Sequence, residues 1–167
     1  MLVAQTSRLI IRHFNHQDTD FIINLLNQPS FINNIGDKQV RNHSDAINYL
    51  NSGPIASYQT YGFGLNMVQL KHDNTPIGMC GLLKRPELAH PDLGYALLPE
   101  HWRKGYIEEA SHAVLADAAK QHKVDNILAV TKPDNIASNA LLSKLGFTVI
   151  GHKSLYGSDN KLYQKQL

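Results

Sequence analysis

The sequence predicts a mixed α/β fold, in which helices cover both faces of a central, mostly antiparallel sheet of six to seven strands. Two observations support this prediction. The first half of the chain contains β-rich segments joined by a short polar turn, which is typical of an antiparallel hairpin. The second half alternates strands with helices, as strand–helix–strand units do.

The composition indicates one soluble globular domain over residues 1–167. This length supports one full core and is too short for two ordinary domains. The net charge of +2 comes from scattered Lys and Arg, which argues against nucleic-acid binding. No apolar run reaches the roughly 20 residues that span a bilayer, and no signal peptide is visible. We therefore expect no membrane association and a cytoplasmic location.

Metal binding and disulfide formation are not expected. The nine histidines form no His-Glu-x-x-His pattern, and a single cysteine allows no zinc-finger spacing. Cys80 lies within the apolar run 77–83, which favours core packing over a catalytic thiol.

In the first half, a strand rich in Ile and Leu is expected at 8–14. Asn15 then offers a helix N-cap, with Asp18 three residues later, and this helix must end before Pro29. A connector is predicted at 30–41 and a second helix at 44–51. A break at 53–54 and a further helical turn at 56–61 follow.

Two strands follow at 63–70 and 77–84, and the polar turn 72–76 joins them. Proline at position 99 ends the strand after this hairpin, because proline has no N–H to donate to a neighbouring strand. The later strands are expected at 93–98, 126–131, 147–152 and 161–166. Two helices are expected between them, at 105–122 and 134–145.

The start of the long helix has the features of an anion site. Apolar residues recur from Ile107 with the helical period, so the helix begins near Gly105. Its first N–H groups lack partners, Arg103 and Lys104 add positive charge, and Gly105 lets the backbone approach a ligand closely. The alternative is an ordinary solvated helix start.

Two separated segments carry a paired motif. The first comprises Gly94, Tyr95, Pro99, Trp102, Gly105 and Tyr106, and the second comprises Pro133 to Asn135, Ser138 and Lys144 to Phe147. Together with the strand Thr6–Arg12, they resemble the GNAT superfamily of acetyl-CoA-dependent N-acetyltransferases, in its ribosomal-protein N-terminal (RimJ/RimL-like) branch. Two positions depart from the superfamily pattern: Trp102 replaces Gln or Arg, and Ile107 replaces Gly or Ala.

The resemblance implies a GNAT fold whose strands splay apart at Pro99, with acetyl-CoA as co-substrate. Its pantetheine arm would pair with the backbone of Ala96, Leu97 and Leu98. The other cofactor-binding residues would be Trp102, Arg103, Lys104, Gly105, Tyr106, Ile107, Asn135 and Ser138. Helix capping by Asn135 and simple packing of Ser138 are the alternatives.

Catalysis would require a base for the amine and stabilisation of the departing thiolate. Asp92 is the predicted base, with Glu87 in reserve, and a surface carboxylate is the alternative for Asp92. The superfamily's usual tyrosine acid is replaced by Leu142. Ser138, a tyrosine such as Tyr156, or no group at all would then protonate the thiolate. The N–H of Leu98 is expected to bind the thioester carbonyl.

The predicted acceptor is the α-amine of a protein or peptide. Deprotonating an α-amine with a pKa near 7.8 costs about 1 kcal/mol at pH 7, against about 4.6 for a lysine. A small amine, and a non-catalytic acyl-CoA-binding module, remain the alternatives. The resemblance also makes a homodimer plausible. Four polar residues are candidates for acceptor binding: Asp37, Arg41, Tyr58 and Tyr61.

Overall fold

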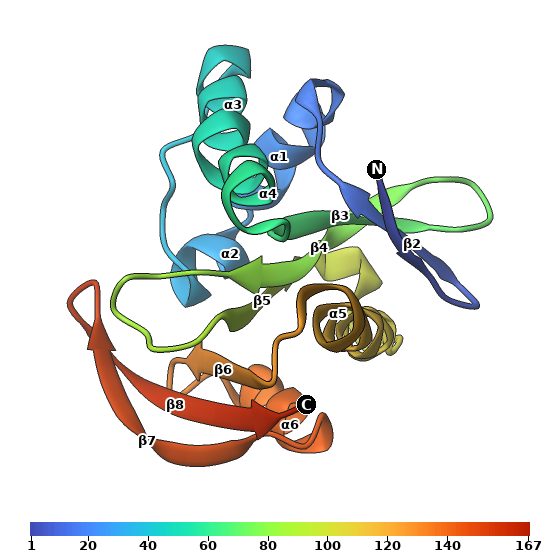
Figure 1. Cartoon of the computed structure of the whole chain (residues 1–167). Coiled ribbons are helices and arrows are strands. Elements are labelled where there is room, and N and C mark those ends of the chain that lie inside the picture. The colour runs from blue at the N-terminus through green and yellow to red at the C-terminus, as the bar shows by residue number, and fades with distance from the viewer.

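A computed structural model describes residues 1–167 and shows an eight-stranded sheet with helices on both faces (Figure 1). The sheet order is β1-β2-β3-β4-β5-β6-β8-β7, and every neighbouring pair is antiparallel except β5 and β6. The predicted fold class is thereby confirmed. The strands are β1 Leu2–Gln5, β2 Leu9–His13, β3 Leu65–Leu70, β4 Pro76–Leu83, β5 Asp92–Leu97, β6 Asn126–Thr131, β7 Thr148–Leu155 and β8 Ser158–Gln166.

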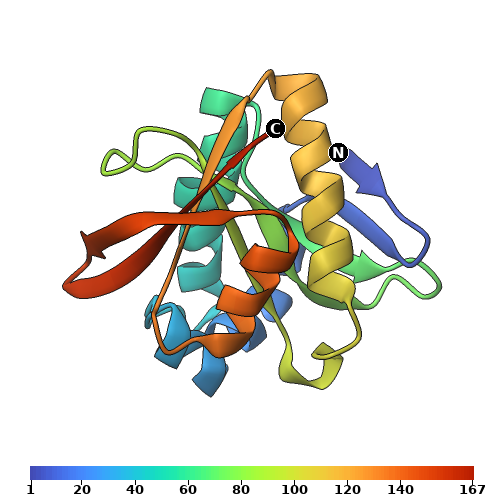
Figure 2. The same cartoon turned by 90° about the horizontal axis from the view of Figure 1, so that it is seen from below.

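Two groups of helices cover opposite faces of the sheet, as the two views show (Figures 1 and 2). One face carries η1 His16–Asp18, α1 Thr19–Leu26, α2 Pro29–Asn34, α3 His43–Leu50, η2 Asn51–Ile55 and α4 Ala56–Tyr61. The other carries α5 Tyr106–His122 and α6 Ile136–Lys144, and the short η3 Pro99–His101 lies between β5 and α5. No helix is long and apolar enough to cross a membrane.

The predicted N-cap at Asn15 is confirmed. Its side chain accepts a hydrogen bond from the N–H of Gln17 at 2.8 Å, and its own N–H donates to Asp18 Oδ2 at 2.9 Å. These reciprocal bonds form a capping box. Asp18 is buried and also pairs with Arg12 at 2.9 Å, so the cap attaches this first turn to β2.

The sequence did not predict β1, which brings the number of strands to eight rather than six or seven. Its four residues form an edge strand that pairs only with β2. Leu2 at its start is 54% exposed, so the segment lacks the clean alternation of a half-buried strand.

Two predictions about the helices are wrong. The connector 30–41 contains α2, which Pro29 opens at a position where proline fits a helix start. The expected break at 53–54 does not occur, because the chain forms a π-helical turn there and continues into α4. A widened turn accommodates Pro54, whose nitrogen has no hydrogen to donate.

The pairing of β5 differs on its two sides. With β4 it forms six consecutive pairs, whereas with β6 it forms one, Asp92 with Leu128. At that point the N–H of Leu128 donates to the carbonyl of Pro91 at 2.9 Å. Beyond it the two strands separate, which confirms the expected splay. The resulting gap between β5 and β6 runs toward Pro99.

Strand alternation assigns the side chains of β5 to two faces. Leu93, Tyr95 and Leu97 pack with the core beneath α5 and α6, while Ala96 packs with the core beneath α1 to α3. Cys80 is fully buried in the first of these cores, as predicted. Two cores thus meet at β5.

Candidate active site

The loop before α5 has unpaired backbone donors. Arg103 and Gly105 adopt left-handed conformations, with φ of 61° and 78°. The N–H groups from Arg103 to Ile107 donate to no acceptor within the protein, and the first helical bond runs from the N–H of Glu109 to Gly105 O. Free N–H groups at the positive end of a 17-residue helix can bind an anion. These residues therefore fit the diphosphate of a nucleotide cofactor.

The backbone of β5 corrects part of the predicted pantetheine site. The N–H of Leu98 donates to Ile77 O at 2.9 Å, so it cannot bind a thioester carbonyl as we expected. Ala96 O also faces β4, because a Cβ added at Gly78 would lie only 2.4 Å from it. Backbone groups alternate sides along a strand, so Tyr95 and Leu97 face the gap instead.

Trp102 binds the end of β5 through its ring nitrogen. Its indole N–H donates to Leu97 O at 3.0 Å, across the turn that follows β5. This bond occupies the Leu97 carbonyl and leaves the Leu97 N–H toward the gap. The large residue found where the superfamily has Gln or Arg thus supports the strand end.

Tyr95 and Ser138 form a hydroxyl pair beside the gap. Their oxygens are 2.6 Å apart, one from β5 and the other from the first turn of α6. Burial raises the pKa of Tyr95 to about 12, against a smaller opposing effect of the Ser138 hydrogen bond. The phenol therefore stays protonated at neutral pH. Asn135 caps α6, since its Oδ1 accepts the Ser138 N–H at 3.3 Å.

The sequence assigned no role to Tyr95, although its motif included the residue. Tyr95 alternates with Leu93 and Leu97 along β5, and this pattern could have placed it on the face that α5 and α6 cover. Tyr156 is 76% exposed in the β7–β8 turn, whereas Leu142 is fully buried in the core. Tyr95 is thus the tyrosine that the fold brings to Ser138.

Asp92 is completely buried at the point where the gap begins. Arg85 Nε donates to its Oδ1 at 3.2 Å, and Arg85 Nη2 lies 3.0 Å from Oδ2, which receives no hydrogen bond. Burial raises the pKa of Asp92 to about 6, although the nearby Arg85 lowers it. The surface-carboxylate alternative is wrong. Because the group is inaccessible, a proton can reach it only through water or local motion.

A hollow of about 410 Å³ opens between the loop that precedes β5 and the strands β6, β7 and β8. Leu128, the pairing partner of Asp92, contributes to its lining, whereas Asp92 itself does not. The charged groups of the hollow include Glu87, which the sequence offered as the reserve base, and the oppositely charged Lys153. The full lining is Glu87, Leu88, Ala89, His90, Leu128, Ile150, Lys153, Leu162 and Gln164.

Two of the predicted acceptor residues, Asp37 and Arg41, are engaged with each other. Arg41 Nη2 lies 2.6 Å from Asp37 Oδ2, and the Arg41 hydrogen bond lowers the pKa of the exposed Asp37. Arg41 also donates to Asn27 at 2.7 Å. Both charges therefore brace the segment between α2 and α3.

Of the two predicted tyrosines, Tyr58 has a structural role and Tyr61 lies far from the start of α5. The Tyr58 hydroxyl accepts from the Phe14 N–H and donates to Leu65 O, so its polar atom is fully used, and burial raises its pKa. Tyr61 stacks on Phe63, whose ring also contacts His122 at the last turn of α5. That end of α5 lies about 25 Å from its start, at 1.5 Å per residue.

Comparison with known proteins agrees with this geometry. The profile of the acetyltransferase (GNAT) domain family matches residues 8–148. The uncharacterized N-acetyltransferase YoaA of Bacillus subtilis is 28% identical over 147 residues, 87% of this chain and 82% of that protein.

Two solved structures share the fold. RimL, a ribosomal L7/L12 α-N-protein acetyltransferase in complex with coenzyme A, superposes with a TM-score of 0.83 at 17% identity, over 100% of this chain and 98% of its own. The microcin C7 self-immunity acetyltransferase MccE, in complex with acetyl-CoA and AMP, superposes with a TM-score of 0.82 at 20% identity. This match covers 97% of this chain and 94% of MccE.

Proposed function

Since the chain belongs to the GNAT acetyltransferase family, and is thus an acyltransferase that uses acetyl-CoA, we propose that it acetylates the N-terminal α-amine of a protein or peptide. RimL has an acceptor of this class, whereas the microcin enzyme was solved with AMP. At 17% and 20% identity, both structures show a shared fold and not a shared acceptor. The choice of acceptor therefore rests on the hollow that Leu128, the partner of Asp92, helps to line.

The composition of that hollow is the observation that supports a peptide acceptor. Leu128, Ile150 and Leu162 provide an apolar surface on which the first side chains of a peptide can pack. Glu87 is its only carboxylate, and Lys153 lies in the same lining. A polyamine needs several converging carboxylates, so the charge balance favours a peptide with one amine.

Acetyl-CoA supplies the acetyl thioester, and the chain holds it in three places. The free N–H groups from Arg103 to Ile107 receive the diphosphate. The backbone of Tyr95 and Leu97 lines the pantetheine arm along the gap. Ser138, at the start of α6, contacts the sulfur, while Asn135 retains its amide NH₂ for a pantetheine carbonyl.

The amine nitrogen attacks the thioester carbonyl carbon, the C–S bond breaks, and the amine loses one proton. An α-amine needs little help, because about one tenth of it is neutral at pH 7. Asp92 takes the proton through water on Oδ2, which forms an ion pair with Arg85 but receives no hydrogen bond. With a pKa of about 6, the carboxylate is mostly ionised at pH 7 and remains a useful base.

Tyr95 and Ser138 stabilise the departing thiolate by hydrogen bonding rather than by full protonation. A thiol with a pKa near 8.5 is about 3.5 units more acidic than a phenol near 12, so complete transfer would cost about 5 kcal/mol. Release of the free thiolate at pH 7 costs only about 2 kcal/mol. A donated hydrogen bond is therefore sufficient.

The proposal is tested by thiol release from acetyl-CoA with N-terminal peptides, the same peptides blocked by N-formylation, polyamines and amine antibiotics. We expect release with the free peptides only. Release with a small amine alone would replace the peptide acceptor. If no amine reacts although acetyl-CoA raises the melting temperature, the chain is a binding module.

Replacing Tyr95 with Phe should lower kcat about tenfold and leave the affinity for CoA unchanged, because one hydrogen bond to the developing thiolate is lost. Ser138→Ala should produce a loss of the same size, and the double variant should be little worse than either. Steady-state kinetics and calorimetry measure both quantities. Additive losses would show that the two hydroxyls act separately.

A further inference from the structure

The first turn of α5 contains two carboxylates, Glu108 and Glu109. Acidic residues at this position normally stabilise a helix by opposing its positive end. They also stand beside the N–H groups that would bind the diphosphate, where a negative charge repels the ligand. Unless these charges are neutralised, the helix start would lose much of its attraction for an anion.

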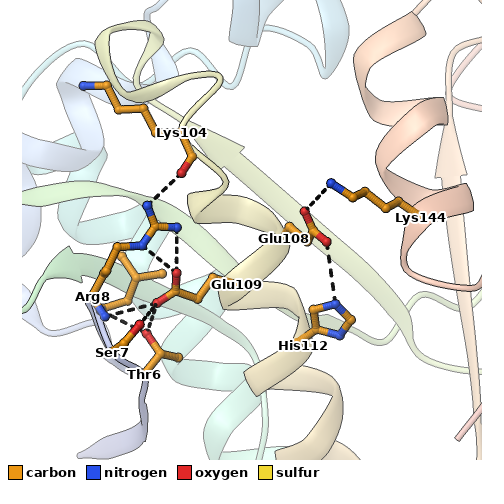
Figure 3. A network of polar contacts seen from close by, with 9 residues as sticks. Thr6, Ser7, Arg8, Lys104, Glu108, Glu109, His112 and Lys144 are labelled. Carbon is orange, nitrogen blue, oxygen red and sulfur yellow. Dashed lines mark hydrogen bonds and ion pairs between the residues drawn. The ribbon is translucent and has the colours of Figure 1, made fainter.

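Each carboxylate has its own cation from a distant segment (Figure 3). Arg8 binds Glu109 Oε2 through Nε and Nη2, both at 2.7 Å. Lys144, in the last turn of α6, places its Nζ 2.9 Å from Glu108 Oε2. The pKa of Glu109 is pushed up by burial, but hydrogen bonds from Thr6 and Arg8 outweigh this and lower it. Glu109 therefore stays ionised and paired.

Arg8 also contacts the loop itself. Its Nη1 donates to Lys104 O at 2.8 Å, and its guanidinium carbon lies 4.5 Å from the centre of the Tyr106 ring. A Cβ added at Gly105 would lie 3.4 Å from Arg8 Nη2. One side chain therefore binds the Lys104 carbonyl, leaves little room beside Gly105 and lies over the Tyr106 ring, so it restrains the loop at the start of α5.

We propose that Arg8 and Lys144 are positioning residues of the cofactor site. They neutralise Glu109 and Glu108, so that the loop from Arg103 to Ile107 keeps its net attraction for the phosphates of CoA. Arg8 additionally holds the loop in the conformation that presents its N–H groups. This inference rests on the placement of the diphosphate in the proposed function, and it is independent of the acceptor.

Isothermal titration calorimetry with CoA, without any acceptor, tests the inference. Arg8→Gln should weaken CoA binding about tenfold, because it leaves Glu109 uncompensated and frees the loop. Lys144→Gln, at a more exposed position, should weaken it about threefold. Lys120→Gln is the matched control, since it removes the same charge from the last turn of α5 and should leave the affinity unchanged.

A double-mutant cycle separates charge compensation from lost packing. Arg8→Gln/Glu109→Gln should recover CoA affinity to within about threefold of the wild type, and Lys144→Gln/Glu108→Gln should recover it fully. Affinity for pantetheine, which has no phosphates, should not change in any variant. If Arg8→Gln does not fold, the Lys144 and Glu108 variants decide the outcome.

Three results would overturn the inference. Single variants that bind CoA like the wild type, or double variants that stay as weak as the singles, would contradict charge compensation while the proposed function stands. An equal loss of pantetheine affinity would show that only packing had changed. A wild-type protein that binds no CoA would overturn the inference and the proposed function together.

Discussion

Asp92→Asn is expected to make the protein more stable at pH 7 and less active. The pKa of Asp92 rises from 3.8 to about 6 on folding, mainly because the carboxylate is buried. At about 1.4 kcal/mol per pKa unit, keeping it ionised costs up to about 3 kcal/mol. Asparagine retains the shape and an oxygen for Arg85 and removes this cost. Urea denaturation should show a gain of about 1 to 3 kcal/mol.

The stability should depend on pH because Asp92 binds its proton differently in the folded and the unfolded protein. The folded protein binds the proton of Asp92 more tightly than the unfolded chain does. The stability linked to this group is therefore fully present below about pH 4 and is lost as the pH rises through about 6. Asp92→Asn should remove this decline. A decline of the same size in the variant would assign it to another group.

The same variant should lower kcat/KM at least tenfold, because Asn accepts no proton. In the wild type, activity should rise with an apparent pKa near 6, and this rise should be absent from Asp92→Asn. A gain in stability with full activity would leave Asp92 as a buried partner of Arg85 only.

Arg85→Gln provides the matched control for Asp92→Asn. It leaves a buried carboxylate without its cation and should destabilise the protein by about 3 kcal/mol or more. The double variant should regain most of that loss. If Arg85→Gln did not change the stability, Arg85 would not stabilise the buried carboxylate of Asp92.

The parts of the site that local rules determine could be predicted from the sequence. Gly105 and the apolar period after Ile107 define a helix start, and Pro99 ends a strand, whatever the remaining chain does. The GNAT resemblance then supplied the splay between β5 and β6, which one paired position confirms.

The remaining parts depend on contacts between distant residues. Which backbone groups of β5 face the gap follows from its register with β4, and one residue's difference moves them to the other side. Arg8 and Glu109 are 101 residues apart, and Tyr95 and Ser138 are 43 apart. Tyr58 looked free in the sequence because Phe14 and Leu65, its partners, belong to other elements.

Gly81→Ala is expected to destabilise the protein by at least about 3 kcal/mol, since overpacking against backbone cannot be relieved by a rotamer change. Gly81 lies in the second half of β4 and pairs with Leu65 on one side and Gly94 on the other. An added Cβ would lie 2.0 Å from Gly64 O and 2.7 Å from the Cα of Leu65. The start of β3 would have to move.

Gly53→Ala is the matched control for Gly81→Ala. It adds the same methyl group within the helical segment 51–55, where no atom outside the local helical turn lies within 4 Å of the new Cβ. Alanine favours the helical backbone over glycine by about 0.5 to 1 kcal/mol, but Gly53 precedes Pro54, whose Cδ crowds a Cβ on the preceding residue in a helix. These effects oppose each other, so this variant should stay within about 1 kcal/mol of the wild type. The urea midpoint should therefore fall far more in Gly81→Ala than in Gly53→Ala.

The effect of Gly81→Ala should extend to the cofactor site. Gly94, its partner on β5, is two residues from Asp92 and leaves room for Leu83 and Leu65, whose side chains would lie 3.1 and 3.3 Å from an added Cβ. Moving β3 therefore disturbs the strand that borders the gap. If the variant folds at low temperature, its CoA affinity should fall with its stability. Wild-type affinity in a destabilised variant would show that β5 holds its position without β3.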